Sequence, residues 1–169
     1  DAVFAPKILT NPNIFYQEGW HYEAEGQDLT YNGVVFNEMK GAMSGVDGVV
    51  EQAVQDMLFP DTCYGYNSGG DPAAIPDLTY EQFLDSYRKN YHPTNARVYL
   101  DGDIPLEKTL ALIESYLSRF TPGTRQQITA QTPKAAAVTV TYEAAPEEDI
   151  SNKTQLVLAK IMGSWADKT

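Results

Sequence analysis

The sequence contains few of the residues that mark several common protein classes. It has one cysteine and two histidines, and 12 basic side chains stand against 23 acidic ones. A single cysteine excludes an internal disulfide framework and favours a reducing compartment, so we expect the cytoplasm or an organelle matrix. The net charge of −11 would repel phosphate backbones and anionic lipid surfaces. We therefore expect no nucleic-acid partner.

Long hydrophobic runs are also missing. The longest uninterrupted apolar stretches have about four residues, as in residues 156–159, whereas a membrane-spanning helix needs about 18 or more. We therefore expect no membrane partner. The sequence does contain 43% hydrophobic and 11% aromatic residues, which is typical of a folded globular domain and not of a disordered chain.

The acidic charge is concentrated in the first part of the chain. Residues 1–103 hold 16 acidic and 5 basic side chains, whereas residues 104–169 hold 7 of each. A solvated, solubilising surface explains this distribution. An acidic wall that attracts a basic ligand explains it as well, and the residues alone leave both interpretations open.

Three helices are predicted from apolar side chains at helical spacing. They span residues 46–58, 80–91 and 106–120. Pro60 ends the first helix, and Thr79 with Gln82 forms a capping-box pair at the start of the second. Asp103 and Pro105 begin the third helix.

Three strands are predicted from runs of residues that favour extended structure. They span residues 96–100, 138–142 and 155–161. Glycine and proline are frequent in residues 61–77, which predicts a long surface loop, and residues 121–134 predict a second one. Helices and strands together indicate an α+β fold.

The two histidines do not form a recognisable metal motif. A zinc peptidase needs two or three imidazole or carboxylate ligands and a carboxylate base, usually on an H-E-x-x-H or H-x-x-E-H helix. His21 and His92 belong to neither pattern. A metal site built from His21, Glu38 and His92 is chemically feasible, but two structural histidines are the simpler interpretation. We expect no catalytic residue within this chain.

Two other candidates are weak. Cys63 has no neighbouring base and no nucleophile turn, so an ordinary loop cysteine is expected. Residues 68–70 superficially resemble a phosphate-binding loop but lack its lysine. Asp71 would repel a phosphate, and Pro72 has no backbone N–H to donate to one. We expect neither a catalytic thiol nor a nucleotide site.

Glu38 is the candidate whose position needs an explanation. If residues 33–41 are helical, Val35 and Met39 share an apolar face, and Glu38 lies beside it. A carboxylate placed there needs a partner, which is either a basic side chain or a metal ion. The spacing alone favours an ordinary salt bridge.

Four motifs, in order along the chain, closely resemble the presequence protease branch of the pitrilysin and insulinase type of zinc peptidases. The motifs are long, and the likeness extends over almost the whole chain. They are FYQEGWHYE at 15–23, YNGVVFNEMKGAMS at 31–44, LFPDTCYGYNSGGDPAAIP at 58–76, and LTYEQFLDSYRKNYHPTNARVYLDGDI at 78–104.

The resemblance implies a role for Glu38. In that family an H-x-x-E-H helix supplies two zinc-binding histidines and the general base, and a glutamate on a later helix is the third ligand. Glu38 in FNEMKG occupies the matching position. The resemblance therefore implies one Zn²⁺ in a longer parent protein, with the histidine pair upstream of Asp1. The chain alone is then expected to be inactive.

The resemblance also implies the fold and the partners. We expect a mixed, mostly antiparallel sheet with helices on one face, as part of a pitrilysin-type metallopeptidase domain. Residues 1–169 would be its later two-thirds: a zinc-ligand helix region at 1–60, the Gly/Pro loop at 61–77, and a helix-strand-helix-strand portion at 78–169. Partners would be unfolded peptides, held in a closed chamber, and the remaining domains of the parent.

Two alternatives remain open. The first is a peptide-binding or assembly domain of the same fold without chemistry. The second lies outside the family and is an acidic protein-interaction domain in which Glu38 makes a salt bridge.

Overall fold

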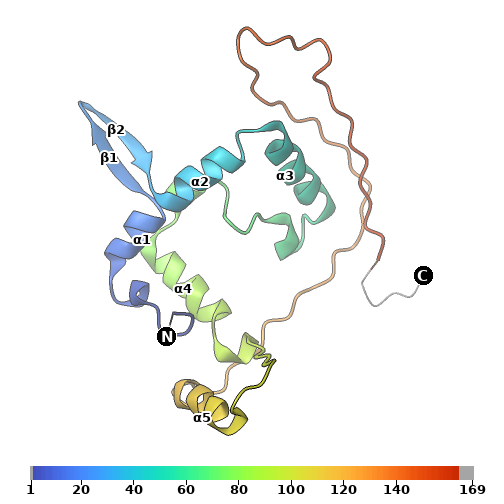
Figure 1. Ribbon diagram of the computed structural model, residues 1–169. Helices are drawn as coiled ribbons and strands as arrows, with labels where there is room; N and C mark the ends of the chain where they lie inside the picture. The colour runs from blue at the N-terminus through green and yellow to red at the C-terminus, as the bar shows by residue number, and fades with distance from the viewer. Residues whose placement is uncertain (1, 164–169) are drawn as a thin grey trace.

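The computed structural model describes residues 2–163, which form a helical body with one β-hairpin and a long extended segment (Figure 1). The regular elements are α1 (Pro12–Glu18), β1 (His21–Glu25), β2 (Asp28–Asn32), α2 (Val34–Ala42), α3 (Val46–Leu58), α4 (Tyr80–Asn90) and α5 (Leu106–Leu117). Short 3-10 turns lie at η1 (Lys7–Leu9), η2 (Cys63–Gly65), η3 (Ile75–Asp77) and η4 (Pro93–Asn95). No helix among residues 2–163 combines the length and the apolar character that crossing a membrane requires.

The three predicted helices are confirmed as α3, α4 and α5. The capping box of α4 forms as expected: Thr79 Oγ1 accepts from the Gln82 N–H at 3.2 Å, and Gln82 Oε1 accepts from the Thr79 N–H at 2.8 Å. Two backbone donors at the helix start are thereby satisfied, which is why α4 begins where the sequence predicts.

A β-hairpin precedes α2. Strands β1 and β2 pair antiparallel from His21 opposite Asn32 to Glu25 opposite Asp28. Gly26 in the connecting turn has a φ of 67°. Glycine populates this left-handed region without a steric penalty, so the chain can reverse direction in two residues.

The three predicted strands do not form. Residues 96–100, 138–142 and 155–161 carry no strand assignment and run extended without a paired neighbour. Alternating side chains indicate that a segment suits a sheet, but the ladder of hydrogen bonds has to come from a second segment. In residues 2–163, only β1 and β2 supply such partners to each other.

The fold class is therefore confirmed only in its coarse form. The chain is α+β, and its two strands are antiparallel. The described residues contain a two-stranded hairpin in place of the larger mixed sheet with helices on one face.

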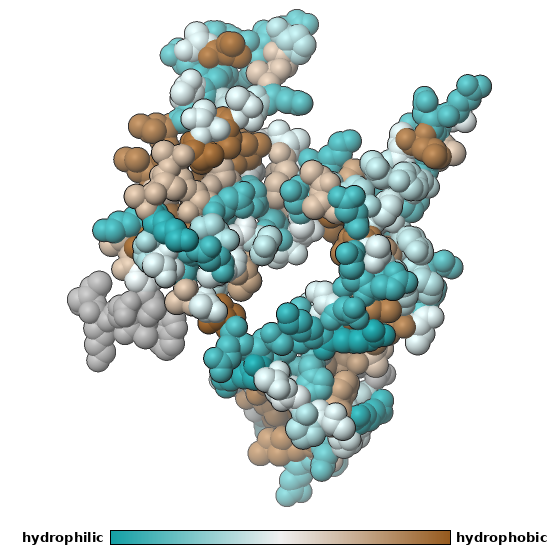
Figure 2. Space-filling model, turned by 180° about the vertical axis from the view of Figure 1, so that it is seen from behind, coloured by the Kyte–Doolittle hydropathy of each residue, from teal (hydrophilic) through white to brown (hydrophobic). Residues whose placement is uncertain are grey.

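The buried core is small and centres on α2. Phe36 and Met39 on α2 and Ile75 in η3 form its buried cluster, against which Trp20 and Val35 pack. Trp20 also donates from Nε1 to the Leu78 carbonyl oxygen at 2.8 Å, which ties the hairpin end to the segment before α4. Many apolar side chains stay at the surface, where Figure 2 shows hydrophobic patches over several parts of the molecule.

Candidate functional site

The start of α2, the helix that carries Glu38, is fixed by its backbone. Gly33 caps the helix with a φ of 152°. A Cβ atom at this position would lie 2.3 Å from the Gly19 carbonyl oxygen and 2.7 Å from Trp20 Cα. Only glycine allows the backbone directly after β2 to approach the backbone directly before β1 this closely.

Asn32 adds a polar anchor at the same place. Its Oδ1 accepts from the Gly33 N–H and from Asn37 Nδ2, each at 2.7 Å. Its own amide nitrogen donates to Glu23 Oε2 at 2.5 Å. The sequence analysis missed this anchor, although the Asn-Gly pair directly before a helix was a usable signal because asparagine commonly bonds to nearby backbone groups.

The buried face of α2 fixes the orientation of the helix about its own axis. Phe36 and Met39 are each only 7% exposed. The Gly/Pro loop closes over this face, since a Cβ atom at Gly69 would lie 2.1 Å from Met39 Sδ. Glycine at position 69 therefore serves packing against α2. The Gly69 N–H donates to Asn67 Oδ1 at 2.9 Å, so this amide already has a partner.

Glu38 lies on the outer side of α2. It is exposed, whereas Met39, the next residue along the helix, is buried. Successive helical residues are rotated by about 100°, so the packing of Phe36 and Met39 turns Glu38 outward. Glu38 therefore lies beside the buried face of α2, and its exposed carboxylate does not need the partner that a buried carboxylate would need. Val34, one turn earlier, is also exposed at 53%.

The salt-bridge interpretation of Glu38 finds no support in the part of the chain that the structure describes. The ion pairs formed there join Arg88 to Asp85, Lys134 to Asp61 and Lys153 to Glu148. Glu38 takes part in none of them, so its carboxylate oxygens are open to solvent and to a ligand.

The two histidines have structural contacts. His21 Nδ1 lies 2.7 Å from the Tyr16 carbonyl oxygen, so this nitrogen carries the proton and donates it. His92 Nδ1 accepts from the Thr94 N–H at 3.2 Å and thereby caps η4, while the ring lies edge-on to Phe120. Within residues 2–163 no three histidine, cysteine or acidic side chains gather closely enough to hold a metal ion. The combination of His21, Glu38 and His92 is therefore not assembled.

Cys63 lies at the surface in η2. It borders a shallow depression together with Gln55, Tyr64, Tyr66, Asn67 and Ser68. None of these neighbours is a general base such as histidine, so the interpretation of Cys63 as an ordinary loop cysteine stands.

Comparison with known proteins decides the family. Residues 77–169, more than half of the chain, match the family model described as "Peptidase M16 inactive domain". The chain belongs to the M16, or pitrilysin, peptidase family. This confirms the resemblance to the pitrilysin type that the sequence motifs indicate.

Several curated relatives narrow the resemblance to the presequence protease branch. Protein HypA of Clostridium perfringens is 41% identical over 175 residues, which cover 99% of this chain and 18% of HypA. Presequence protease 1 of Arabidopsis thaliana is 46% identical over 71% of this chain and 11% of its own length. The mitochondrial presequence protease of Xenopus tropicalis is 38% identical over 98% of this chain and 17% of its own. The chain thus spans less than a fifth of the length of these M16 relatives.

Proposed function

We propose that this M16 chain is part of a zinc-dependent metallo-endopeptidase and that Glu38 is its third zinc ligand. The position of Glu38 is the observation that supports this proposal most directly. Its carboxylate is exposed and has no partner among the described residues, and the helix that carries it is fixed at its start and along its buried face. The family membership and the FNEMKG motif support the same role.

Glu38 suits zinc chemically, but it supplies only part of a site. Carboxylate oxygen is an ordinary zinc ligand, and a catalytic zinc takes three protein ligands and keeps one position for water. When bound, zinc lowers the pKa of that water so that it becomes a nucleophile near neutral pH. Residues 2–163 contain no second and third ligand beside Glu38, so these have to come from other parts of a longer protein.

The residues of this chain then act by positioning. Gly33 and Asn32 set where α2 begins, and the packing of Met39 under Gly69 sets the rotation of the helix, so the backbone at Glu38 is held at a defined place before metal binds. A ligand residue whose backbone is held in place loses less conformational entropy on binding. Because one carboxylate cannot retain zinc or activate water, we expect the 169-residue chain to be inactive alone.

The proposed substrates are unfolded peptides, and the proposed partners are the remaining domains of the parent protein. Residues 1–169 would form the later part of its zinc-bearing domain, with the divisions at 60 and 77 that the sequence predicts. Several relatives are named as mitochondrial or chloroplastic proteases, which supports an organelle matrix. HypA comes from a bacterium, which supports a location in the cytoplasm.

A second candidate is a non-catalytic peptide-binding or assembly domain of the same fold. The observation that favours it is the description of the matching family model as an inactive domain. Glu38 lies outside the matched residues 77–169, so this match and the zinc role of Glu38 concern different parts of the chain.

The test is Glu38→Gln in the full parent protein, with Glu51→Gln on α3 as the matched control, since both glutamates are exposed helix residues. Cleavage and binding of an unstructured basic peptide are measured for each. We expect Glu38→Gln to abolish cleavage and keep peptide binding, while Glu51→Gln keeps both. Binding without cleavage in the parent and in both variants would establish the non-catalytic candidate and overturn the peptidase.

A further inference from the structure

The chain passes from the β-hairpin into α2 through an Asn-Gly pair. Asn32 is the last residue of β2, and Gly33 is the N-cap of α2, so the strand leads directly into the helix (Figure 1). The side-chain amide carbon of an asparagine can be attacked by the backbone nitrogen of the next residue, which closes a cyclic imide. A glycine at that next position has no Cβ atom to hinder the attack. The pair is therefore reactive by its covalent structure.

The structure holds the two reacting groups of this pair together. The Gly33 N–H donates to Asn32 Oδ1 at 2.7 Å. Because Oδ1 is bonded to the amide carbon Cγ, the Gly33 nitrogen lies beside the atom that it would attack. Asn32 is only partly buried, so water reaches its side chain. Reacting groups that are held in contact react faster than groups that meet only occasionally.

A second donor faces the oxygen on which charge would develop. Attack on Cγ places negative charge on Asn32 Oδ1, and the Gly33 nitrogen has by then given up its proton. Asn37 Nδ2 donates to the same Oδ1 at 2.7 Å. Asn37 lies on α2, and its backbone N–H donates to the Gly33 carbonyl oxygen at 3.0 Å, so this donor is in place before the reaction begins. A donor positioned in advance toward a developing oxyanion lowers the barrier.

The nitrogen of the Asn32 amide points toward the hairpin. Asn32 Nδ2 donates to Glu23 Oε2 at 2.5 Å, and Glu23 is an exposed residue of β1. This bond and the two at Oδ1 fix which end of the amide carries the oxygen. The oxygen thus faces its two donors, while the nitrogen that would leave lies beside an exposed carboxylate.

We propose that Asn32 and Gly33 form a site of self-modification, at which the chain converts its own asparagine to aspartate and isoaspartate. Hydroxide takes the proton of the Gly33 nitrogen, and this nitrogen bonds to Asn32 Cγ. The bond between Cγ and Nδ2 then breaks, and the nitrogen leaves as ammonia with a proton from water. One water molecule opens the cyclic imide at either of its carbonyl carbons. Water is the co-reactant that is consumed, and no group is oxidised or reduced.

The products change the junction that positions α2. Both replace the amide donor of residue 32 by a carboxylate, which meets the Glu23 carboxylate, so a hydrogen bond becomes a like-charge repulsion. Isoaspartate also adds one methylene to the main chain directly before Gly33. The backbone has no spare room there, since even a Cβ atom at Gly33 would lie 2.3 Å from the Gly19 carbonyl oxygen. The modification therefore loosens α2 from the hairpin, independently of any metal at Glu38.

The experiment incubates the full chain in mildly alkaline buffer, both folded and in guanidinium chloride, and follows residue 32 by peptide mass spectrometry. Chromatography separates the aspartate and isoaspartate peptides. We expect the folded chain to convert Asn32 at least as fast as the unfolded chain does. Asn37→Ala should slow the conversion in the folded chain about tenfold, which is the effect of one hydrogen bond to a developing charge. It should leave the rate in guanidinium chloride unchanged.

Asn90→Ala is the matched control, because Asn90 is an exposed helical asparagine whose amide donates to the Ser86 carbonyl oxygen within α4. It should leave the conversion of Asn32 unchanged. Asn37→Asp is a second test, since an ionised aspartate keeps the shape of the side chain but cannot donate. Circular dichroism establishes that each variant is folded. The proposal is overturned if folding suppresses the conversion, if both Asn37 variants convert Asn32 as fast as the unmodified chain, or if Asn90→Ala slows it equally.

Discussion

Replacing Gly33 by alanine should destabilise the chain and displace the helix that carries Glu38. Gly33 has a φ of 152°, a conformation that an L side chain rarely adopts. The new Cβ would also lie 2.3 Å from the Gly19 carbonyl oxygen, well inside van der Waals contact. Both atoms involved at Gly19 and Trp20 belong to the backbone, so no side-chain rotation relieves the clash.

The size of the effect follows from two costs. An alanine forced into a sparsely populated backbone region costs about 1–3 kcal/mol. Moving the Gly19 carbonyl away breaks its hydrogen bond with the Phe36 N–H, at 3.3 Å, and a bond of this kind contributes about 0.5–1.5 kcal/mol. We therefore expect Gly33→Ala to lower the free energy of unfolding by about 2–4 kcal/mol.

Urea unfolding followed by circular dichroism measures this change. Gly41→Ala is the matched control, because Gly41 lies on the same helix and a Cβ there meets no atom within 4 Å. Alanine favours a helix over glycine by up to about 1 kcal/mol, so this variant should be slightly more stable. An unfolding free energy of Gly33→Ala equal to that of the unmodified chain would refute the account of how α2 is positioned.

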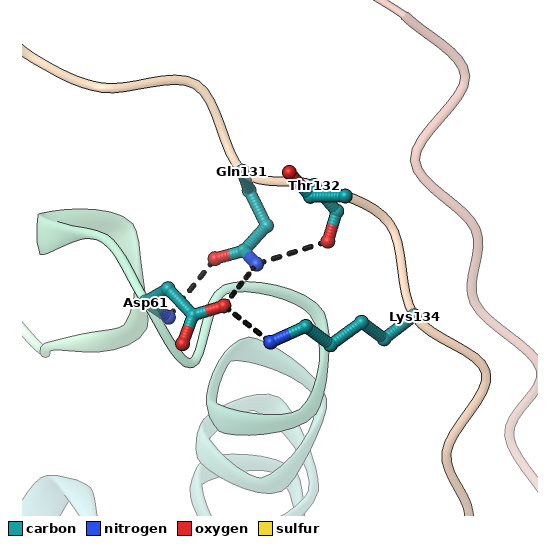
Figure 3. Close-up of polar contacts among 4 residues, drawn as sticks. All are labelled: Asp61, Gln131, Thr132 and Lys134. Atoms are coloured by element: carbon teal, nitrogen blue, oxygen red, sulfur yellow. Dashed lines mark hydrogen bonds and ion pairs between the residues drawn. The ribbon is translucent and has the colours of Figure 1, made fainter.

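Three further predictions concern single contacts. Thr79→Ala removes the capping box of α4 and should cost about 0.5–2 kcal/mol in urea unfolding, whereas Thr79→Ser should cost much less. Trp20→Phe removes the hydrogen bond to the Leu78 carbonyl oxygen and should lower stability by about 0.5–1.5 kcal/mol; an unchanged Tm would contradict that bond. Lys134 Nζ and Gln131 Nε2 donate to the Asp61 carboxylate (Figure 3) and lower its pKa, so these two hydrogen bonds should be complete above the ordinary pKa of 3.8 and be lost as the pH falls below it, through the lowered pKa. A nitroxide label on the exposed Cys63 broadens the NMR signals of nearby amides; the broadening at residues 129–136, recorded from pH 7 to pH 2, checks this, and unchanged broadening at pH 2 would count against it.

The sequence predicts the helices well because their signals are local. Helix α4 begins at its capping box, and α3 ends before Pro60, as the residues indicate. The hairpin β1–β2 has an equally local basis in Gly26, but its strands mix apolar and acidic residues, so the pattern of apolar residues predicts no strand there. Local chemistry thus decides where these elements form.

The strands and the site are harder to predict because they depend on distant residues. Residues 138–142 have the alternation of a strand, yet no segment in the described chain pairs with them. The motif marks Glu38 as a candidate, but the direction in which it points follows from the packing of Met39 under Gly69, some thirty residues away along the chain. The spacing of apolar residues on α2 did not contain that information.

The most direct test of the central claim is the zinc content of the full parent protein and of its Glu38→Gln and Glu51→Gln variants, measured by mass spectrometry of the purified, dialysed proteins. The account predicts one zinc per chain in the parent and in Glu51→Gln, and a large loss of zinc in Glu38→Gln, because an amide oxygen is a far weaker zinc ligand than a carboxylate. One zinc per chain, retained equally in Glu38→Gln, would contradict the role of Glu38 as a metal ligand.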